Sequence, residues 1–385
     1  MGALLVSSVG DLAAGLALGF MTGTLERLPG LIVLVPAAIG MRGNIFGALG
    51  SRLGTAIHTG EFDGTLERRN LAGQNMMASA ALTLYVSIAL AVLAKETARV
   101  FGVETIPFTH YLTVSVIGGI VSSTVILAIT LAVATLSVRR NWDMDNVAAP
   151  IVTAAGDLIT LPSLWLTTFL LPIDRLPDLV TALSLGAALW ITANLLKRRE
   201  LRIYRRIVRS SLFILILAGL VDVVAGLTIE RRLEHFLTFP GLLVLIPPFL
   251  EDAGALGGIL SARLASKLHL GSIQARTVPG LNSWEDILLT YILGTPVFFF
   301  VGISGTIVAH AVGLATPGVS AMIALSMLAG AVATTGAVFV AYYTAVISFR
   351  FGLDPDNYGI PVVTSSMDLV GAIALIISMV ILGIA

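Results

Sequence analysis

Long apolar stretches recur along the chain, separated by short polar segments. A membrane-spanning helix needs about 20 consecutive, mostly apolar residues. Eleven stretches of about that length lie near residues 3–22, 30–51, 71–94, 110–137, 147–172, 177–196, 210–229, 240–262, 284–311, 317–348 and 358–384. The pattern predicts an all-α integral membrane protein with about eleven transmembrane helices. Because the stretches near 30–51 and 240–262 contain glycines and polar residues, we expect both to be broken helices.

The composition agrees with a membrane protein. Of 385 residues, 56% are hydrophobic and only 12% are charged, against roughly 25% charged in ordinary soluble domains. The formal net charge is zero, so nothing suggests a nucleic-acid partner. The chain has no cysteine, which excludes a disulfide framework and thiolate metal ligands. A signal peptide is the alternative reading of the first stretch, but that stretch lacks a basic n-region and many more spans follow.

The basic residues predict how the chain is oriented. With the N-terminus in the cytosol, most Lys and Arg residues fall in cytosolic loops, as the positive-inside rule requires. The densest cluster runs from Lys197 to Arg209 and would set topology and contact anionic lipid. We therefore expect a multi-pass protein of the cell membrane with its N-terminus cytosolic and its C-terminus outside.

The chain contains an internal repeat. Shifted by 211 residues, Asp11 aligns with Asp222, Gly43 with Gly254 and Asp157 with Asp368, without a gap. Each copy has five spans, and the extra span between them returns the chain to the starting side. We expect a first repeat at 1–173, a linker helix and basic loop at 174–209, and a second repeat at 210–385. The two parallel five-helix repeats would then be related by a pseudo-two-fold axis along the membrane normal.

Two aspartates are the strongest candidates for a cation site. Asp157 and Asp368 lie inside the last apolar span of each repeat, where an ionisable group is costly and usually functional. Thr153 and Thr364 lie four residues earlier, on the same helix face. Two carboxylates and retained waters suit Mg²⁺, which binds through few direct ligands. The alternative is a protonated aspartate that hydrogen-bonds a neighbouring helix.

Other repeated acidic residues are further candidates. Asp145 and Asp356 belong to a D-x-D-N motif that precedes each of those spans. They could cap the helix or form an acidic vestibule that concentrates cations. Asp11 and Asp222 lie in the first span of each repeat, and a direct role with the ion is one possibility for them.

The segment 36–60 combines a proline with closely spaced glycines. Gly43 permits close backbone approach, and Asn44 and exposed carbonyls would be hard oxygen ligands. The alternative is a helix contact made by small residues.

These motifs resemble the MgtE and solute carrier family 41 superfamily of magnesium channels and transporters. The resemblance rests on LVPAAIGMRGNIFGALGSRLGTAIHTG at 34–60, LIPPFLEDAGALGGILSARLASKLHLG at 245–271, AAGDLITL at 154–161 and SSMDLVG at 365–371. It implies a fused duplicate whose central Mg²⁺ site uses Asp157 and Asp368, with the family's Gly-Asn motif at Gly43 and Asn44. The second repeat departs from this pattern, with Gly254-Ala255 at the Gly-Asn position and additional acidic residues at Glu251 and Asp252.

We therefore expect transport of Mg²⁺ or another divalent cation along the axis between the repeats, without a cofactor. Membrane lipid is an expected partner, and a homo-oligomer is possible. Channel and ion-coupled carrier both remain open. The alternatives are an intramembrane enzyme and a receptor or assembly subunit that does not transport. The enzyme would need a nucleophile or a paired-histidine metal site, and the sequence has no H-E-x-x-H or G-x-S-x-G motif and no cysteine.

Overall fold

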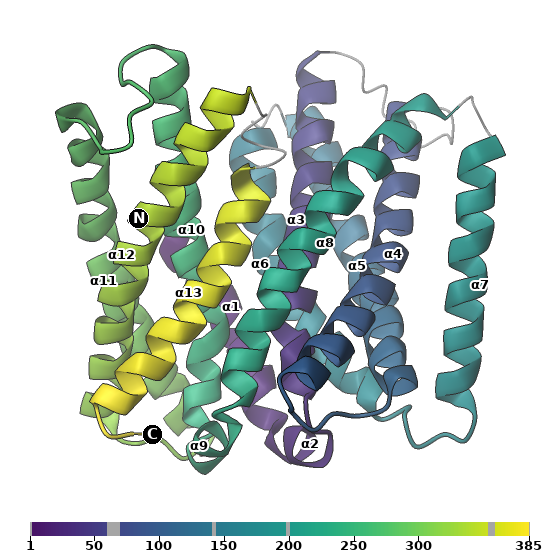
Figure 1. Cartoon of the computed structure of the whole chain (residues 1–385), viewed down its shortest axis with the longest axis horizontal. Helices are drawn as coiled ribbons and strands as arrows, with labels where there is room; N and C mark the ends of the chain where they lie inside the picture. Colours follow the sequence, from purple (N-terminus) through teal and green to yellow (C-terminus); the bar gives the residue numbers. More distant parts are fainter. Residues whose placement is uncertain (1, 60–69, 141–143, 198–200, 353–358, 385) are drawn as a thin grey trace. The chain divides into compact units, whose positions relative to one another are not determined.

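The computed structural model describes residues 2–59, 70–140, 144–197, 201–352 and 359–384, and these are helical with short connections (Figure 1). The helices are α1 (Gly2–Phe20), α2 (Thr22–Arg27), α3 (Leu31–His58), α4 (Leu71–Val100), α5 (Phe108–Arg140), α6 (Met144–Thr168), α7 (Leu176–Lys197), α8 (Arg202–Glu230), α9 (Leu233–Thr238), α10 (Gly241–His269), α11 (Leu281–Ala311), α12 (Val319–Phe351) and α13 (Ile360–Ile381). No strand occurs in these ranges, so the all-α prediction is confirmed.

Ten of the described helices are long and apolar enough to cross a membrane. Helix α1 occupies the place of the remaining predicted span, although its apolar part within the described residues, Ser7–Phe20, is shorter than a full span. The short helices α2 and α9 are too brief to show as apolar stretches and were not predicted.

The helix boundaries follow the repeat. Helices α5 and α12 begin at aligned residues, Phe108 and Val319, and also end at aligned residues, Arg140 and Phe351. Helices α3 and α10 end at the aligned histidines His58 and His269. The short helices α2 and α9 are also equivalent. Helix α7 lies between the two copies and has no counterpart.

The chain folds into two compact units that differ from the sequence repeats. One unit contains Met1–Gly23 and Val224–Ala385, and the other contains Thr24–Val223. The first helix of the chain is therefore part of the unit built mainly from the second repeat.

Helix α1 packs along α10 and also contacts α11. Leu12 joins Val244 and Ala309 in an apolar cluster. Gly15 faces the backbone carbonyl of Val244 so closely that a Cβ at this position would overlap the carbonyl oxygen. Pro248 has no N–H to donate to that carbonyl four residues earlier, so the close approach of α1 occurs where the hydrogen bonding of α10 is interrupted.

Helix α8 is the first helix of the second repeat. Most of it belongs to the unit built mainly from the first repeat. The side chain of Gln74 on α4 accepts hydrogen bonds from the backbone N–H groups of Ile203 and Tyr204, at 3.1 and 3.2 Å. A Cβ at Gly219 would lie 2.6 Å from Cδ2 of Leu90 and 3.8 Å from Sδ of Met41. Each repeat thus contributes its first helix to the unit formed by the other.

Equivalent arginines link the second and third long helices of each repeat. Arg52 Nε donates to Asn75 Oδ1 at 2.7 Å, and Arg263 Nε donates to Asp286 Oδ1 at 2.8 Å. Arg263 and Asp286 are the counterparts of Arg52 and Asn75 in the second repeat. That repeat adds a charge pair, because Lys267 Nζ lies 2.6 Å from the other oxygen of Asp286.

Replacing Gly15 with alanine should destabilise the unit that contains α1. The new methyl group would overlap the Val244 carbonyl, and overpacking of this kind typically costs about 1–3 kcal/mol. Thermal unfolding in detergent measures the loss. The matched control is Gly186→Ala in α7, where a Cβ meets no atom within 4 Å, and it should leave the midpoint unchanged or slightly raised. Equal midpoints for the two variants would contradict the close approach of α1.

Replacing Asp286 with asparagine should give Arg263 a neutral amide partner, like the one that Arg52 has in the first repeat. The variant keeps an acceptor for Arg263 but loses both ion pairs, at a cost of about 1–2 kcal/mol given the partial exposure of the cations. Asp178→Asn, at an exposed position of α7, is the control and should have no effect. If Asp286→Asn unfolds at the same midpoint as the wild type and the control, the ion pairs do not stabilise the fold.

Candidate cation site

The first of two candidate cation sites, here called the first corner, lies where α3 packs against α6. A Cβ at Gly156 would lie 4.0 Å from the backbone nitrogen of Gly43, so the two backbones meet with no side chain between them. Asp157 follows Gly156 and is only 2% exposed. The structure therefore brings the Gly43–Asn44 pair of α3 to the segment of α6 that carries the predicted carboxylate.

The second corner lies in the other unit, where α10 packs against α13. A Cβ at Gly254, the counterpart of Gly43, would lie 3.9 Å from Cα of Thr364. The Thr364 hydroxyl donates to the Ile360 carbonyl at 3.0 Å, which satisfies its hydrogen within the helix and leaves oxygen lone pairs available. Asp368 lies one turn further along α13 and is half-buried.

Polar atoms near the first corner have no partner within the described part of the protein. The side-chain amide nitrogen of Asn44 is buried and makes no hydrogen bond there, and the same holds for the hydroxyl of Thr160. Thr160 follows Asp157 by three residues and so shares its helix face. Sequence reasoning missed Thr160, although its spacing from Asp157 could have indicated it. Buried polar groups normally have partners, so these atoms mark a place where water can bind.

An open strip runs along α3 next to this corner. A Cβ at Gly43 or at Gly47, one turn later, would meet no atom within 4 Å. The counterpart of Gly47 on α10, Gly258, is equally open. These glycines therefore do more than allow helices to touch, because one side of each borders space that no atom of the described residues fills.

Helices α3 and α10 are continuous, so the expectation of broken helices was wrong. Helix α3 runs through Pro36, and α10 runs through Pro247 and Pro248. A proline within a helix removes one N–H donor and leaves one carbonyl without its usual partner. Neighbouring helices can compensate for that loss in a membrane protein, and so the prolines interrupt the hydrogen bonding without ending the helices.

The remaining predicted residues are placed as follows. Asp11 and Asp222 are fully buried, with an exposed fraction of 0%. Through the exchange of first helices, Asp11 lies in the unit that contains Asp368, and Asp222 lies in the unit that contains Asp157. Thr153 is half-buried on α6, one turn before Asp157. Asp145 is in the first turn of α6 but its side chain lies outside the described part, as does all of Asp356, so the cap and vestibule interpretations both stay open.

The two units differ most around Asp252. This carboxylate is 1% exposed and accepts a hydrogen bond from the Ser8 hydroxyl of α1 at 2.7 Å. The equivalent positions in the other unit are Met41 and Gly219, which are apolar. A buried acidic group therefore joins the exchanged helix to its host unit in one half only.

A buried arginine is present in the unit built from the first repeat and is replaced in the other unit. Arg42 on α3 is 2% exposed, and its guanidinium donates to the Ala38 carbonyl at 2.9 Å and to the Ser87 hydroxyl at 3.4 Å. A Cβ at Gly119 would overlap the same guanidinium. In the other unit Ala253 replaces Arg42, and the phenyl ring of Phe298 lies against Gly330, the counterpart of Gly119. The arginine thus fills space that an aromatic ring fills in the second repeat.

The donor set consists of carboxylate and hydroxyl groups in both corners, and the first corner adds the amide of Asn44. Hard oxygen ligands of this kind suit Mg²⁺ and similar ions rather than soft metals. Among the described residues no three His, Cys, Asp or Glu side chains gather closely enough to hold a metal. Such corners are suited to a cation that keeps much of its water.

A family model described as "Divalent cation transporter" matches the chain twice, at residues 35–167 and 246–378. The chain belongs to this family, MgtE. The two matched segments are related by the same shift that aligns Asp157 with Asp368 in the sequence. The internal repeat is therefore confirmed, and each MgtE segment contains one complete corner.

The MgtE-family chain is also similar to animal members of solute carrier family 41. It is 25% identical to mouse solute carrier family 41 member 3 over 95% of this chain and 78% of the relative. It is 27% identical to member 2 from Xenopus laevis, over 99% of this chain and 71% of the relative, and 27% identical to human member 2, over 97% and 68%. No solved structure matches the chain significantly. The MgtE family consists of transporters, so the protein is a divalent cation transporter and not an intramembrane enzyme.

Proposed function

We propose that this MgtE-family protein carries Mg²⁺ across the membrane along a pathway at a pseudo-two-fold axis between its two repeats. The repeats are 1–173 and 210–385, and residues 174–209 link them. The observation that carries the proposal is that each unit presents a carboxylate beside a glycine crossing, Asp157 at Gly43–Gly156 and Asp368 at Gly254–Thr364.

The proposed mechanism follows from the cost of placing a divalent ion among apolar helices. A hydrated Mg²⁺ gives up its water reluctantly, so the pathway must hold the ion by charge while leaving room for water. Asp157 and Asp368 supply the charge, and the open sides of Gly43 and Gly258 supply room next to the helices. The ligands proposed around them are Thr153, Thr364, Asn44 and the backbone at Gly43.

Other acidic residues serve the same pathway in this proposal. Asp145 and Asp356 form a vestibule that raises the local cation concentration at the entrance. Asp11 and Asp222 add negative charge from the exchanged helices α1 and α8. The N-terminus is cytosolic and the C-terminus is outside, which puts the vestibule at the cytosolic end.

The two corners are unequal in this proposal. Only the first has the Asn44 amide, since Ala255 replaces it in the second. Only the second unit has Glu251 and Asp252 nearby in sequence, at the positions of Gly40 and Met41. A single ion held between the repeats would therefore meet different ligands on its two sides.

Neutralising either carboxylate should impair transport. In proteoliposomes loaded with a fluorescent Mg²⁺ indicator, Asp157→Asn and Asp368→Asn should each weaken apparent Mg²⁺ affinity by about tenfold or more, which corresponds to about 1.4 kcal/mol of lost binding energy. The double variant should be inactive. Asp178→Asn removes an exposed carboxylate of α7 and is the control, with unchanged flux. Wild-type flux in the double variant would contradict the proposed site.

Moving the amide from one repeat to the other tests whether both repeats line one pathway. Asn44→Ala should reduce Mg²⁺ flux, because a hard oxygen ligand is lost. The double variant Asn44→Ala/Ala255→Asn restores the same set of ligands with the amide on the opposite side, and we expect it to recover a substantial part of the flux. Ala255→Asn alone controls for tolerance of the new side chain. If Ala255→Asn alone is active but the double variant has no more Mg²⁺ flux than Asn44→Ala, the two positions do not share a pathway.

A further inference from the structure

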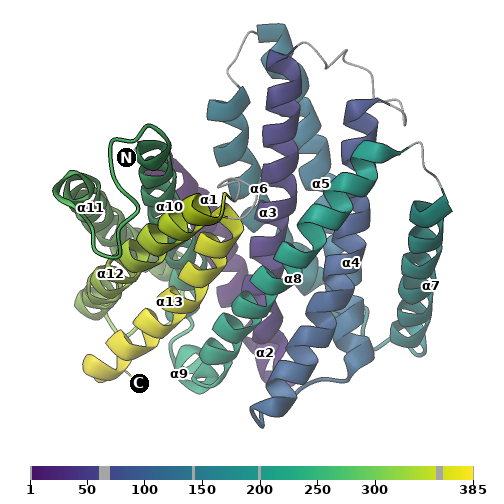
Figure 2. The same ribbon diagram turned by 45° about the horizontal axis from the view of Figure 1, so that its top comes forward.

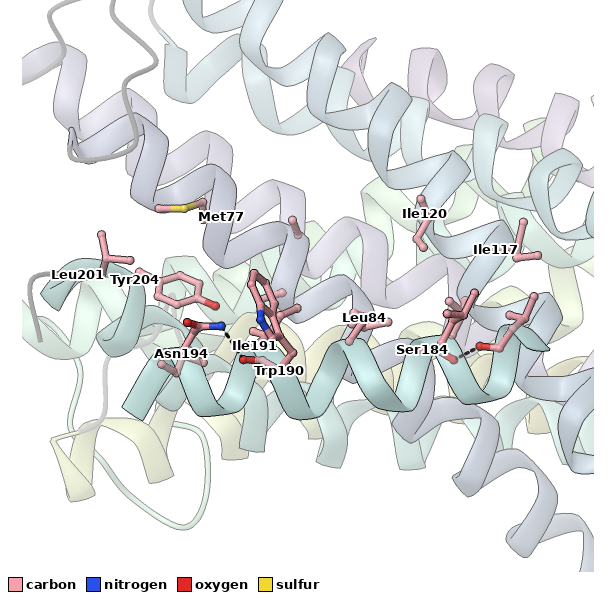
Figure 3. Close-up of a pocket in the computed structure, with 17 residues that line it drawn as sticks. Met77, Leu84, Ile117, Ile120, Ser184, Trp190, Ile191, Asn194, Leu201 and Tyr204 are labelled. Atoms are coloured by element: carbon pink, nitrogen blue, oxygen red, sulfur yellow. Dashed lines mark hydrogen bonds between the residues drawn. The ribbon is translucent and has the colours of Figure 1, made fainter. Parts of the chain in front are cut away.

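A large cavity lies in the unit Thr24–Val223, and none of its lining residues belongs to the first corner. Its volume is about 790 Å³, within the range of roughly 300–1,000 Å³ that is usual for small-molecule sites. Its walls come from α4, α5, α7 and the start of α8, and Figure 3 shows the lining side chains. Because α7 has no counterpart in the repeat, this cavity belongs to the linker helix and not to the duplicated structure.

The cavity is almost entirely apolar. None of its lining residues is charged, and Leu84, Ile117, Ile120 and Leu183 are typical of its walls. An ion would lose its hydration there without compensation. The site therefore suits a hydrocarbon chain and not a cation.

Helix α7 leaves the cavity accessible to the surrounding bilayer. Only 11% of the apolar stretch of α7 is buried within the protein. The helix stands beside α4 at the edge of this unit in both ribbon views (Figures 1 and 2). It is fixed to α4 by the Tyr85 hydroxyl, which lies 2.8 Å from the Thr192 hydroxyl. An acyl chain could therefore enter beside α7 without displacing the helix.

One end of the cavity is polar and leads to a group of arginines. Trp190, Asn194 and Tyr204 lie together at that end, next to Leu201 (Figure 3). Arg202 and Arg205 follow Leu201 in the first turn of α8, the former exposed and the latter half-buried. Indole, amide and phenol groups favour the level of lipid headgroups, and basic residues at the edge of helix pockets bind anionic headgroups.

From the apolar cavity and its basic end we infer a binding site for an anionic phospholipid of the surrounding bilayer. The acyl chain occupies the space between α7 and helices α4 and α5. The phosphate lies at the polar end, where Arg202 and Arg205 neutralise its charge and Asn194 and Tyr204 offer hydrogen bonds. The bound lipid fills the gap between the linker helix and the first repeat's helices.

Quenching of Trp190 by brominated lipid tests the site directly. The other tryptophans, Trp142, Trp165 and Trp284, are replaced by phenylalanine, and the full-length protein is reconstituted in mixed vesicles in which either phosphatidylglycerol or phosphatidylcholine carries the bromine. At equal mole fractions we expect brominated phosphatidylglycerol to bind and quench with a several-fold preference. The preference should fall with each arginine removed, because a basic residue at the membrane surface attracts anionic lipid.

Two variants with matched controls decide the outcome. Arg202→Gln/Arg205→Gln should abolish the preference, while Arg276→Gln/Arg350→Gln, an equal change in net charge at exposed arginines of the second repeat, should retain it. Ala187→Phe fills the cavity and should abolish selective quenching, whereas Ala182→Phe changes an exposed residue of the same helix that does not line the cavity. Equal quenching by both lipids, or a preference that survives the arginine pair, overturns the inference. The arginine variants leave the cavity intact, so they decide the question even if Ala187→Phe fails to fold.

Discussion

The cost of a carboxylate within apolar helices is the constraint on which this structure depends. Each unit accommodates one such group on the last long helix of a repeat, Asp157 on α6 or Asp368 on α13. In each case the helix that carries the carboxylate packs against the partnering helix at a glycine, Gly43 or Gly254. Close approach brings backbone and small polar groups near the carboxylate, where bulky apolar side chains would have left it isolated.

Exchange of the first helices gives each unit a helix that comes from the other repeat. Helix α1 completes the unit built from the second repeat, and most of α8 belongs to the unit built from the first. A fused duplicate of this kind differs from two independent domains, since each unit lacks a helix unless the other repeat is present in the chain.

Much of this architecture could be predicted from the sequence, for identifiable reasons. Helix positions follow from the length of apolar stretches, and the constant offset between the repeats is enough by itself to align Asp157 with Asp368. The exchange of α1 could not be predicted, because it depends on Gly15 meeting the Val244 carbonyl of a distant helix, a match of shape that leaves no periodic signal. Broken helices were wrongly expected near 30–51 and 240–262, because glycines and polar residues in a membrane helix can be accommodated by packing against neighbouring helices. That the buried Thr160 hydroxyl makes no hydrogen bond within the described residues likewise emerges only from the packing.

The absence of cysteine from the chain permits the most direct test of the central claim, that Asp157 and Asp368 share one pathway. Cysteines introduced together at these two positions would be the only thiols in the protein. The measurement is Cd²⁺ inhibition and thiol cross-linking of Asp157→Cys/Asp368→Cys in membranes, compared with each single variant. Our account predicts that the double variant cross-links within one chain and binds Cd²⁺ more tightly than either single variant. The account would be contradicted if the double variant failed to cross-link with the shortest reagents and bound Cd²⁺ no more tightly than the single variants.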